Sequence, residues 1–177
     1  MSKYGPKALA ICGPKKSGKT SLICQLVRYL RRRSVRVAVV KHTVHTHFLD
    51  TPGSDTDRYR MAGALATGLV MPQGYAHFRY FEPQLEPILH RHFEFADLVL
   101  LEGFGSSPLP KLILRPSWDP DYAASVDPAT VLGILDEPGA DLPSSLRHVT
   151  LRLAPDNVEA LADWLMTHFL EAPGTGA

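Results

Sequence analysis

The sequence predicts an α/β fold, a mainly parallel sheet flanked by helices on both faces, and two observations predict it. Short apolar runs alternate along most of the chain with segments whose apolar residues recur at helical spacing. Strands that alternate with helices are typical of parallel sheets covered on both faces. The second observation is an eight-residue loop that joins the first apolar run to the first amphipathic segment.

This loop, GPKKSGKT at residues 13–20, matches the P-loop pattern G-x-x-x-x-G-K-[ST]. Its two glycines allow tight turns that bring backbone N–H groups to phosphate oxygens. The helix that follows adds its free N–H groups and its positive dipole end. The motif therefore predicts a P-loop NTPase fold, with nucleotide contacts from Gly13, Pro14, Lys15, Lys16, Ser17, Gly18, Lys19, Thr20 and Ser21.

Two side chains of the loop have specific chemistry. Lys19 supplies a mobile cation for the β- and γ-phosphates, and the Thr20 hydroxyl can ligate Mg²⁺. A P-loop site also needs an acidic group for its metal, usually at the end of an apolar strand. Glu102 ends the run DLVLLE, so we interpret Thr20 and Glu102 as the metal ligands. The alternative for Glu102 is an ordinary strand end at the surface.

Two aspartates are candidate catalytic residues. Asp50 opens Asp-Thr-Pro-Gly, which resembles the D-x-x-G switch of GTPases, although Pro52 and Gly53 would explain a simple turn by themselves. Asp55 follows at the start of a predicted helix, where it would either cap the helix or reach the metal. The cap is the favoured interpretation, because aspartate is common at this position.

The strands are predicted from short apolar runs. Residues 8–12 form the first, and residues 35–40, VRVAVV, form the second because they are rich in β-branched residues. Residues 97–101 are another buried strand. Shorter runs predict strands at 69–71, 111–114, 131–135 and 148–153, whereas the polar and aromatic residues 75–81 are interpreted as a connection.

The helices are predicted from apolar residues at helical spacing. The first runs from the P-loop to about Arg33, with one apolar face made by Leu22, Ile23, Leu26, Val27 and Leu30. Further helices are expected at 55–64, 83–92 and 157–170. We expect one nucleotide-binding domain over residues 1–170 and a loose tail over 171–177.

Composition limits the possible functions. Of the 177 residues, 45% are hydrophobic and 21% are charged, and the formal net charge is +1. A nearly neutral chain gives no reason to expect binding to nucleic acid or to an anionic membrane. No apolar run approaches the ~18 residues of a membrane span, and the N-terminus lacks a signal-peptide pattern. We therefore expect a cytoplasmic protein, with Cys12 and Cys24 as small buried residues.

The loop after the second strand contains three histidines, His42, His45 and His47. This cluster could bind a transition metal, or it could contact phosphate or a second substrate, and spacing alone does not decide between these roles. The P-loop motif does not show whether the protein binds GTP or ATP. Many GTPases recognise guanine with N-K-x-D, whose aspartate accepts hydrogen bonds from the guanine N1 and N2 groups. The single asparagine of this chain, Asn157, is not followed by lysine.

Three segments together resemble the molybdopterin-guanine dinucleotide biosynthesis protein B family, the MobB-like P-loop proteins. They are GPKKSGKTSL at 13–22, VVKHTVHTHFLDTPGSDTDRYRMAGA at 39–64 and DLVLLEGFGSSPLPKLILRP at 97–116. Their order and spacing also match, over roughly the first two thirds of the chain. The family usually has a lysine after E-G-F and often one after the P-G pair, where this chain has Gly105 and Ser54.

The resemblance implies a GTP-binding adaptor in molybdenum cofactor biosynthesis that is at most a weak, Mg²⁺-dependent GTPase. It implies that the protein acts beside the guanylyltransferase that joins GMP to molybdopterin, and that it forms a homodimer. By position, Lys41, His42, Asp50 and Asp55 would belong to the loop that faces the γ-phosphate or the substrate of the partner.

Two other functions are compatible with the residues. A P-loop small-molecule kinase would need an acceptor pocket and usually an arginine-rich lid, and the arginines of this chain are scattered. A metal-delivery GTPase would use the histidine loop.

Overall fold

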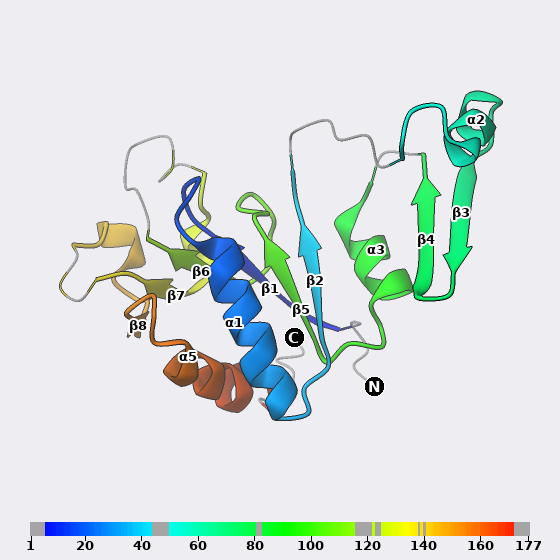
Figure 1. Ribbon diagram of the computed structural model, residues 1–177. Coiled ribbons are helices and arrows are strands. Elements are labelled where there is room, and N and C mark those ends of the chain that lie inside the picture. Colours follow the sequence, from blue (N-terminus) through cyan, green and yellow to red (C-terminus); the bar gives the residue numbers. More distant parts are fainter. Residues whose placement is uncertain are drawn as a thin grey trace. The chain divides into compact units, whose positions relative to one another are not determined.

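The computed structural model describes residues 6–43, 50–80, 83–115, 122, 125–137, 139 and 141–171. The chain forms two compact units (Figure 1). The first contains residues 1–42 and 86–177, and the second contains residues 43–85. The prediction of one domain over residues 1–170 stays a prediction, and each unit is described by itself.

A six-stranded parallel sheet forms the centre of the first unit (Figure 1). Every pairing in it is parallel, which confirms the predicted sheet. The strands lie in the order β2 (Val37–Lys41), β5 (Leu98–Glu102), β1 (Lys7–Cys12), β6 (Lys111–Leu114), β7 (Val131–Leu135) and β8 (Leu151–Leu153). Because all six run in one direction, their carboxyl ends meet at one edge, where parallel sheets bind ligands.

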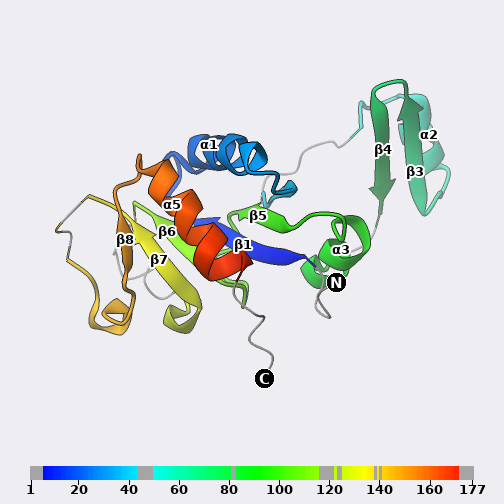
Figure 2. The ribbon, with the colours of Figure 1, turned by 90° about the horizontal axis from the view of Figure 1, so that it is seen from below.

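One face of the sheet is covered by α1 (Lys19–Arg32) and α5 (Val158–Trp164), which continues as the π-helical segment η3 (Leu165–Leu170) (Figure 2). The helices pack there because their apolar residues lie on one side, as the spacing predicts. The core between helices and sheet includes Leu9, Ile11, Leu22, Leu26, Leu30, Leu98, Leu100, Leu112 and Leu161, each at most 4% exposed.

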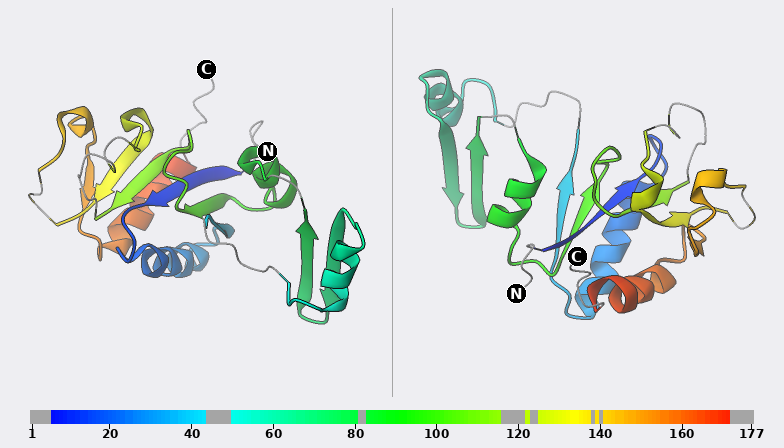
Figure 3. Two further views of the ribbon diagram at one scale, coloured as in Figure 1. Left: turned by 90° about the horizontal axis from the view of Figure 1, so that it is seen from above. Right: turned by 180° about the vertical axis from the view of Figure 1, so that it is seen from behind.

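The opposite face is covered by α3 (Leu85–His92) and by the segments that contain two short 3-10 helices (Figure 3). These are η1 (Pro128–Thr130) and η2 (Ser144–Leu146). Ile113, Val131 and Ile134 of the sheet form a second apolar cluster with three residues of these segments, Val126, Leu146 and Val149. Helices on both faces are thus confirmed.

The second unit consists of α2 (Asp55–Met61) and an antiparallel hairpin of β3 (Ala66–Met71) and β4 (Gly74–Arg79). The interpretation of residues 75–81 as a connection was wrong, because residues 74–79 form β4. The strand predicted at 69–71 is confirmed as part of β3. The strand β4, in contrast, was not predicted, because its sequence GYAHFR has no continuous apolar run.

One expectation about the first unit was also wrong. Cys12 is buried as expected, but Cys24 is exposed. Residue 24 falls outside the face of α1 that carries Leu22, Ile23 and Leu26, and it therefore points away from the sheet. Within the described residues, no helix has the length and apolar character to cross a bilayer.

Candidate nucleotide-binding site

The P-loop lies between β1 and α1, and its backbone has the conformation that the glycines were expected to allow. Gly13, Lys16 and Gly18 all have positive φ angles, 147°, 65° and 98°. A Cβ atom on Gly13 would lie 2.2 Å from the carbonyl oxygen of Leu114, so only glycine fits against β6 at this position. Gly18 is the N-cap of α1 and makes no side-chain cap, which leaves the first N–H groups of the helix available to an anion.

Lys19 folds back over the loop. Its Nζ donates hydrogen bonds to the carbonyl oxygens of Gly13, at 3.0 Å, and of Pro14, at 2.6 Å. Burial lowers the pKa of Lys19, while the nearby Glu102 carboxylate acts in the opposite direction. The loop thus holds the ammonium group at its own centre, where a bound polyphosphate would meet it.

Glu102 joins three elements at the carboxyl edge of the sheet. Its Oε2 accepts a hydrogen bond from the Thr20 hydroxyl at 2.9 Å, and its Oε1 pairs with Lys41 Nζ at 2.8 Å. The strand register explains this meeting, because Ile11 of β1 and Lys41 of β2 both lie opposite Glu102 of β5. Burial raises the pKa of Glu102, but the bonds from Lys41 and Thr20 outweigh burial and hold the pKa below its ordinary value.

The residues that follow β2 and β5 extend this edge. The His42 N–H donates to the Glu102 carbonyl oxygen at 3.0 Å, and the His42 and Phe104 rings lie 5.1 Å apart. Gly103 has a φ of 94°, and a Cβ there would contact His42 Cβ at 3.5 Å. The chain therefore turns sharply after Glu102 and leaves the carboxylate at the mouth of the P-loop.

Comparison with known proteins identifies the family. A family model described as "Molybdopterin guanine dinucleotide synthesis protein B", MobB, matches residues 8–136, which is well over half of the chain. The chain belongs to the MobB family. The resemblance noted from the sequence is thereby confirmed, and the match spans the P-loop, Lys41, His42 and Glu102.

Two relatives of this MobB-family chain are molybdopterin-guanine dinucleotide biosynthesis adapter proteins. The protein of Haemophilus influenzae is 36% identical over 110 residues, which cover 60% of this chain and 62% of the relative. The protein of Escherichia coli is 32% identical over 111 residues, which cover 60% of this chain and 63% of the relative. The matched part thus spans less than two thirds of either relative.

Solved MobB structures have the same fold. A crystal structure of molybdopterin-guanine biosynthesis protein B has a TM-score of 0.67 and 24% identity, and covers 90% of this chain and 96% of that protein. The Bacillus subtilis MobB structure has a TM-score of 0.68 and 19% identity, and likewise covers 90% and 96%. These likenesses agree with the P-loop fold predicted from the motif.

The site fits a nucleotide with Mg²⁺. Thr20 and Glu102 place a hydroxyl and a carboxylate side by side at the P-loop, and oxygen atoms are the ligands that Mg²⁺ prefers. At Gly18 an added Cβ would meet nothing within 4 Å, so there is room for a phosphate group at the start of α1. When bound, Mg²⁺ would neutralise charge on the phosphate oxygens.

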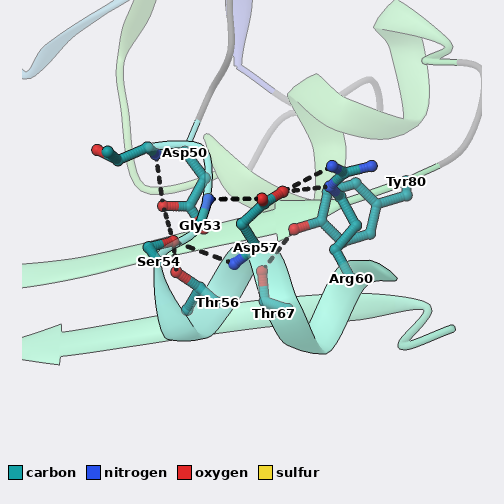
Figure 4. A network of polar contacts seen from close by, with 9 residues as sticks. Asp50, Gly53, Ser54, Thr56, Asp57, Arg60, Thr67 and Tyr80 are labelled. Atoms are coloured by element: carbon teal, nitrogen blue, oxygen red, sulfur yellow. Dashed lines mark hydrogen bonds and ion pairs between the residues drawn. The ribbon is translucent and has the colours of Figure 1, made fainter. Parts of the chain in front are cut away.

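The two candidate catalytic aspartates lie in the second unit. Asp50 Oδ1 accepts bonds from the Thr51 N–H at 2.8 Å and the Ser54 hydroxyl at 2.9 Å, which is the contact pattern of a turn. Asp55 pairs with Arg58 at 3.4 Å. The expectation that Asp55 caps α2 was wrong: the cap is Ser54, whose Oγ accepts from the Asp57 N–H (Figure 4). Their catalytic roles stay predictions.

Figure 4 also shows the polar contacts that connect the turn before α2 with the helix. Asp57 accepts a hydrogen bond from the Gly53 N–H at 2.9 Å and pairs with Arg60 at 2.6 Å. The bond from Gly53, followed by that from Arg60, holds the pKa of Asp57 below its usual range. The Asp-Thr-Pro-Gly segment therefore forms the turn that leads into α2.

The histidine cluster and Lys111 differ in what the structure describes of them. His45 and His47 lie outside the described residues, and the described residues contain no group of three or more His, Cys, Asp or Glu side chains arranged to hold a metal. Lys111, in contrast, was missed. It is fully buried, and its Nζ donates to the Ser107 carbonyl oxygen at 2.8 Å, which fixes the turn after Glu102. The L-P-K motif was its only sequence signal.

Proposed function

We propose that this protein is a GTP-binding adaptor in the biosynthesis of the molybdenum cofactor, where it acts with the guanylyltransferase that forms molybdopterin guanine dinucleotide. Membership of the MobB family and the adapter relatives support the pathway. The observation that supports nucleotide binding is the 2.9 Å hydrogen bond from Thr20 to Glu102, which places a hydroxyl and a carboxylate together where they would hold Mg²⁺.

The contacts around the loop support weak hydrolysis. In the described part of the first unit, the cations bonded to the P-loop backbone or to Glu102 are Lys19 and Lys41. Fast phosphoryl transfer in P-loop GTPases uses an arginine that stabilises the transition state, supplied by the same chain or by a partner. With lysines alone in these positions, we expect slow hydrolysis, which a partner enzyme would complete by supplying the missing groups.

The second unit supports a homodimer. Val70 of β3 and Tyr75 of β4 lie opposite each other in the hairpin and are 87% and 79% exposed. Side chains on a strand alternate between its two faces, so Val70 lies on the opposite face to Thr67, the buried residue of the strand. A two-stranded sheet with an exposed apolar pair is marginally stable in water, and a second copy of the same hairpin would cover it.

Calorimetric titration with Mg²⁺ tests the nucleotide site. We expect GTP to bind more tightly than ATP and Lys19→Ala to abolish GTP binding, because the ammonium group is the central cation of the loop. Arg31→Ala is the matched control, since it removes the same charge at the other end of α1, roughly 18 Å away. Equal or preferred binding of ATP would favour a small-molecule kinase, and failure to bind either nucleotide would contradict the proposal.

A further inference from the structure

The candidate Mg²⁺ ligands lie on one side of β1 at the carboxyl edge of the sheet. Glu102 and Thr20, the pair that fits Mg²⁺, lie on the β5 side of β1. Mg²⁺ held by this pair would neutralise charge on the terminal phosphates, so the end of the phosphate chain would lie on this side. The α-phosphate, the ribose and the base would then extend the other way along the edge, toward the carboxyl ends of β6 and β7, which lie on the other side of β1.

Two backbone hydrogen bonds fix the residues at the ends of these strands. The Arg115 N–H donates to the Leu135 carbonyl oxygen at 2.8 Å, and the Asp136 N–H donates to the Leu153 carbonyl oxygen at 3.0 Å. Asp136 is therefore held directly at the carboxyl end of β7, between the ends of β6 and β8. Neighbouring strands are about 4.8 Å apart, so β7 lies about 10 Å from the P-loop strand along the edge.

The Asp136 carboxylate is oriented but has bonding capacity left. Its Oδ1 accepts a hydrogen bond from the Glu137 N–H at 2.9 Å, and among the described residues its Oδ2 has no hydrogen-bond partner. The side chain is half-buried, whereas the adjacent Glu137 is exposed. A carboxylate held in this way can accept two hydrogen bonds from a planar ligand that presents adjacent donors.

We propose that Asp136 reads the guanine base, in place of the aspartate of the absent N-K-x-D motif. The inference rests on the proposed GTP site. Guanine presents N1–H and an N2 amino group side by side, and a carboxylate accepts from both. Adenine has a lone pair at N1 and no donor at C2, so it would face the same carboxylate with an acceptor. Asp136 thereby selects GTP over ATP.

The test is the Asp136→Asn variant titrated with GTP, ATP, xanthosine triphosphate and inorganic tripolyphosphate in the presence of Mg²⁺. The asparagine amide donates where the carboxylate accepted, and xanthine carries a carbonyl oxygen at C2 where guanine carries an amino group. We expect GTP affinity to fall about 10- to 100-fold and xanthosine triphosphate affinity to rise. Tripolyphosphate binding stays unchanged, because the P-loop is not altered.

Glu137→Gln is the matched control, because it removes an adjacent exposed carboxylate, and it leaves all four affinities unchanged. A preference for GTP that survives Asp136→Asn would overturn this inference alone. Loss of tripolyphosphate binding in Asp136→Asn would overturn it as well, since the residue would then be maintaining the fold. Equal binding of GTP and ATP by the unmodified protein would instead overturn the proposed function, and with it this inference.

Discussion

The two compact units differ in what fills their interiors. The first contains fully buried leucine and isoleucine side chains on both faces of its sheet. The second has one buried residue among those described in its helix and hairpin, Thr67, and exposes several large apolar side chains. The first unit therefore has an apolar core that can support a nucleotide site, whereas the described helix and hairpin of the second unit leave large apolar side chains exposed.

The largest effect is expected from removing a core side chain of the first unit. Leu100 in β5 is fully buried, and Leu100→Ala should lower the free energy of unfolding by about 2–5 kcal/mol through lost burial and the cavity left behind. Val70→Ala in β3, 87% exposed, is the matched change in the second unit and should cost within about 0.5 kcal/mol in the monomer. Urea unfolding measures both. A similar loss of unfolding free energy in the two variants would contradict the difference in burial between the two units.

An intermediate effect is expected on self-association. The double variant Val70→Ser/Tyr75→Ser should weaken the dimer about 10- to 100-fold, because it removes the exposed apolar pair of the hairpin. Sedimentation at several concentrations measures the dissociation constant. Phe95→Ser, which removes an apolar side chain that is 60% exposed in the first unit, is the control and should leave it unchanged. A protein that is monomeric throughout would refute the dimer, and an unchanged dimer would assign its interface elsewhere.

The smallest effect is the loss of stability on changing Glu102 at the carboxyl edge of the sheet, and it depends on pH. The folded-state pKa of Glu102 lies below its ordinary value near 4.5, so its ionised form stabilises the fold. This stabilisation is present above that value and is lost as pH falls through the lower folded-state pKa. Glu102→Gln should therefore cost about 1 kcal/mol at pH 7, with the difference disappearing in acid. A difference that is constant with pH would exclude a role for the carboxylate charge.

Sequence reasoning predicted the first unit well, for a physical reason. Strands such as β1 and β5 are buried on both faces and appear as continuous apolar runs, and the P-loop needs glycine at defined positions. In the second unit, only part of β3 was predicted, from the apolar run at 69–71. The strand β4 was missed because its short alternation of Ala76 and Phe78 with polar residues is a weaker signal than a continuous apolar run.

The sequence predicted some contacts of the candidate site and missed others. The strand-end argument placed Glu102 correctly beside Thr20, because parallel strands share one carboxyl edge. The pairing of Lys41 with Glu102 depends on the register of β2 against β5, which local sequence does not fix. The burial of Lys111 was likewise beyond prediction, since a lysine in a strand ordinarily reaches solvent.

The order of the strands also has a consequence for synthesis of the chain. β1 is made first, but its neighbours in the sheet are β5 and β6, which begin about ninety and one hundred residues later. β2 likewise pairs with β5 alone. At roughly 5–20 residues per second, the ribosome leaves the P-loop strand without a partner for several seconds. During that interval its apolar side chains are exposed to other nascent chains and to chaperones, and the nucleotide cradle can form only after residue 102 has emerged.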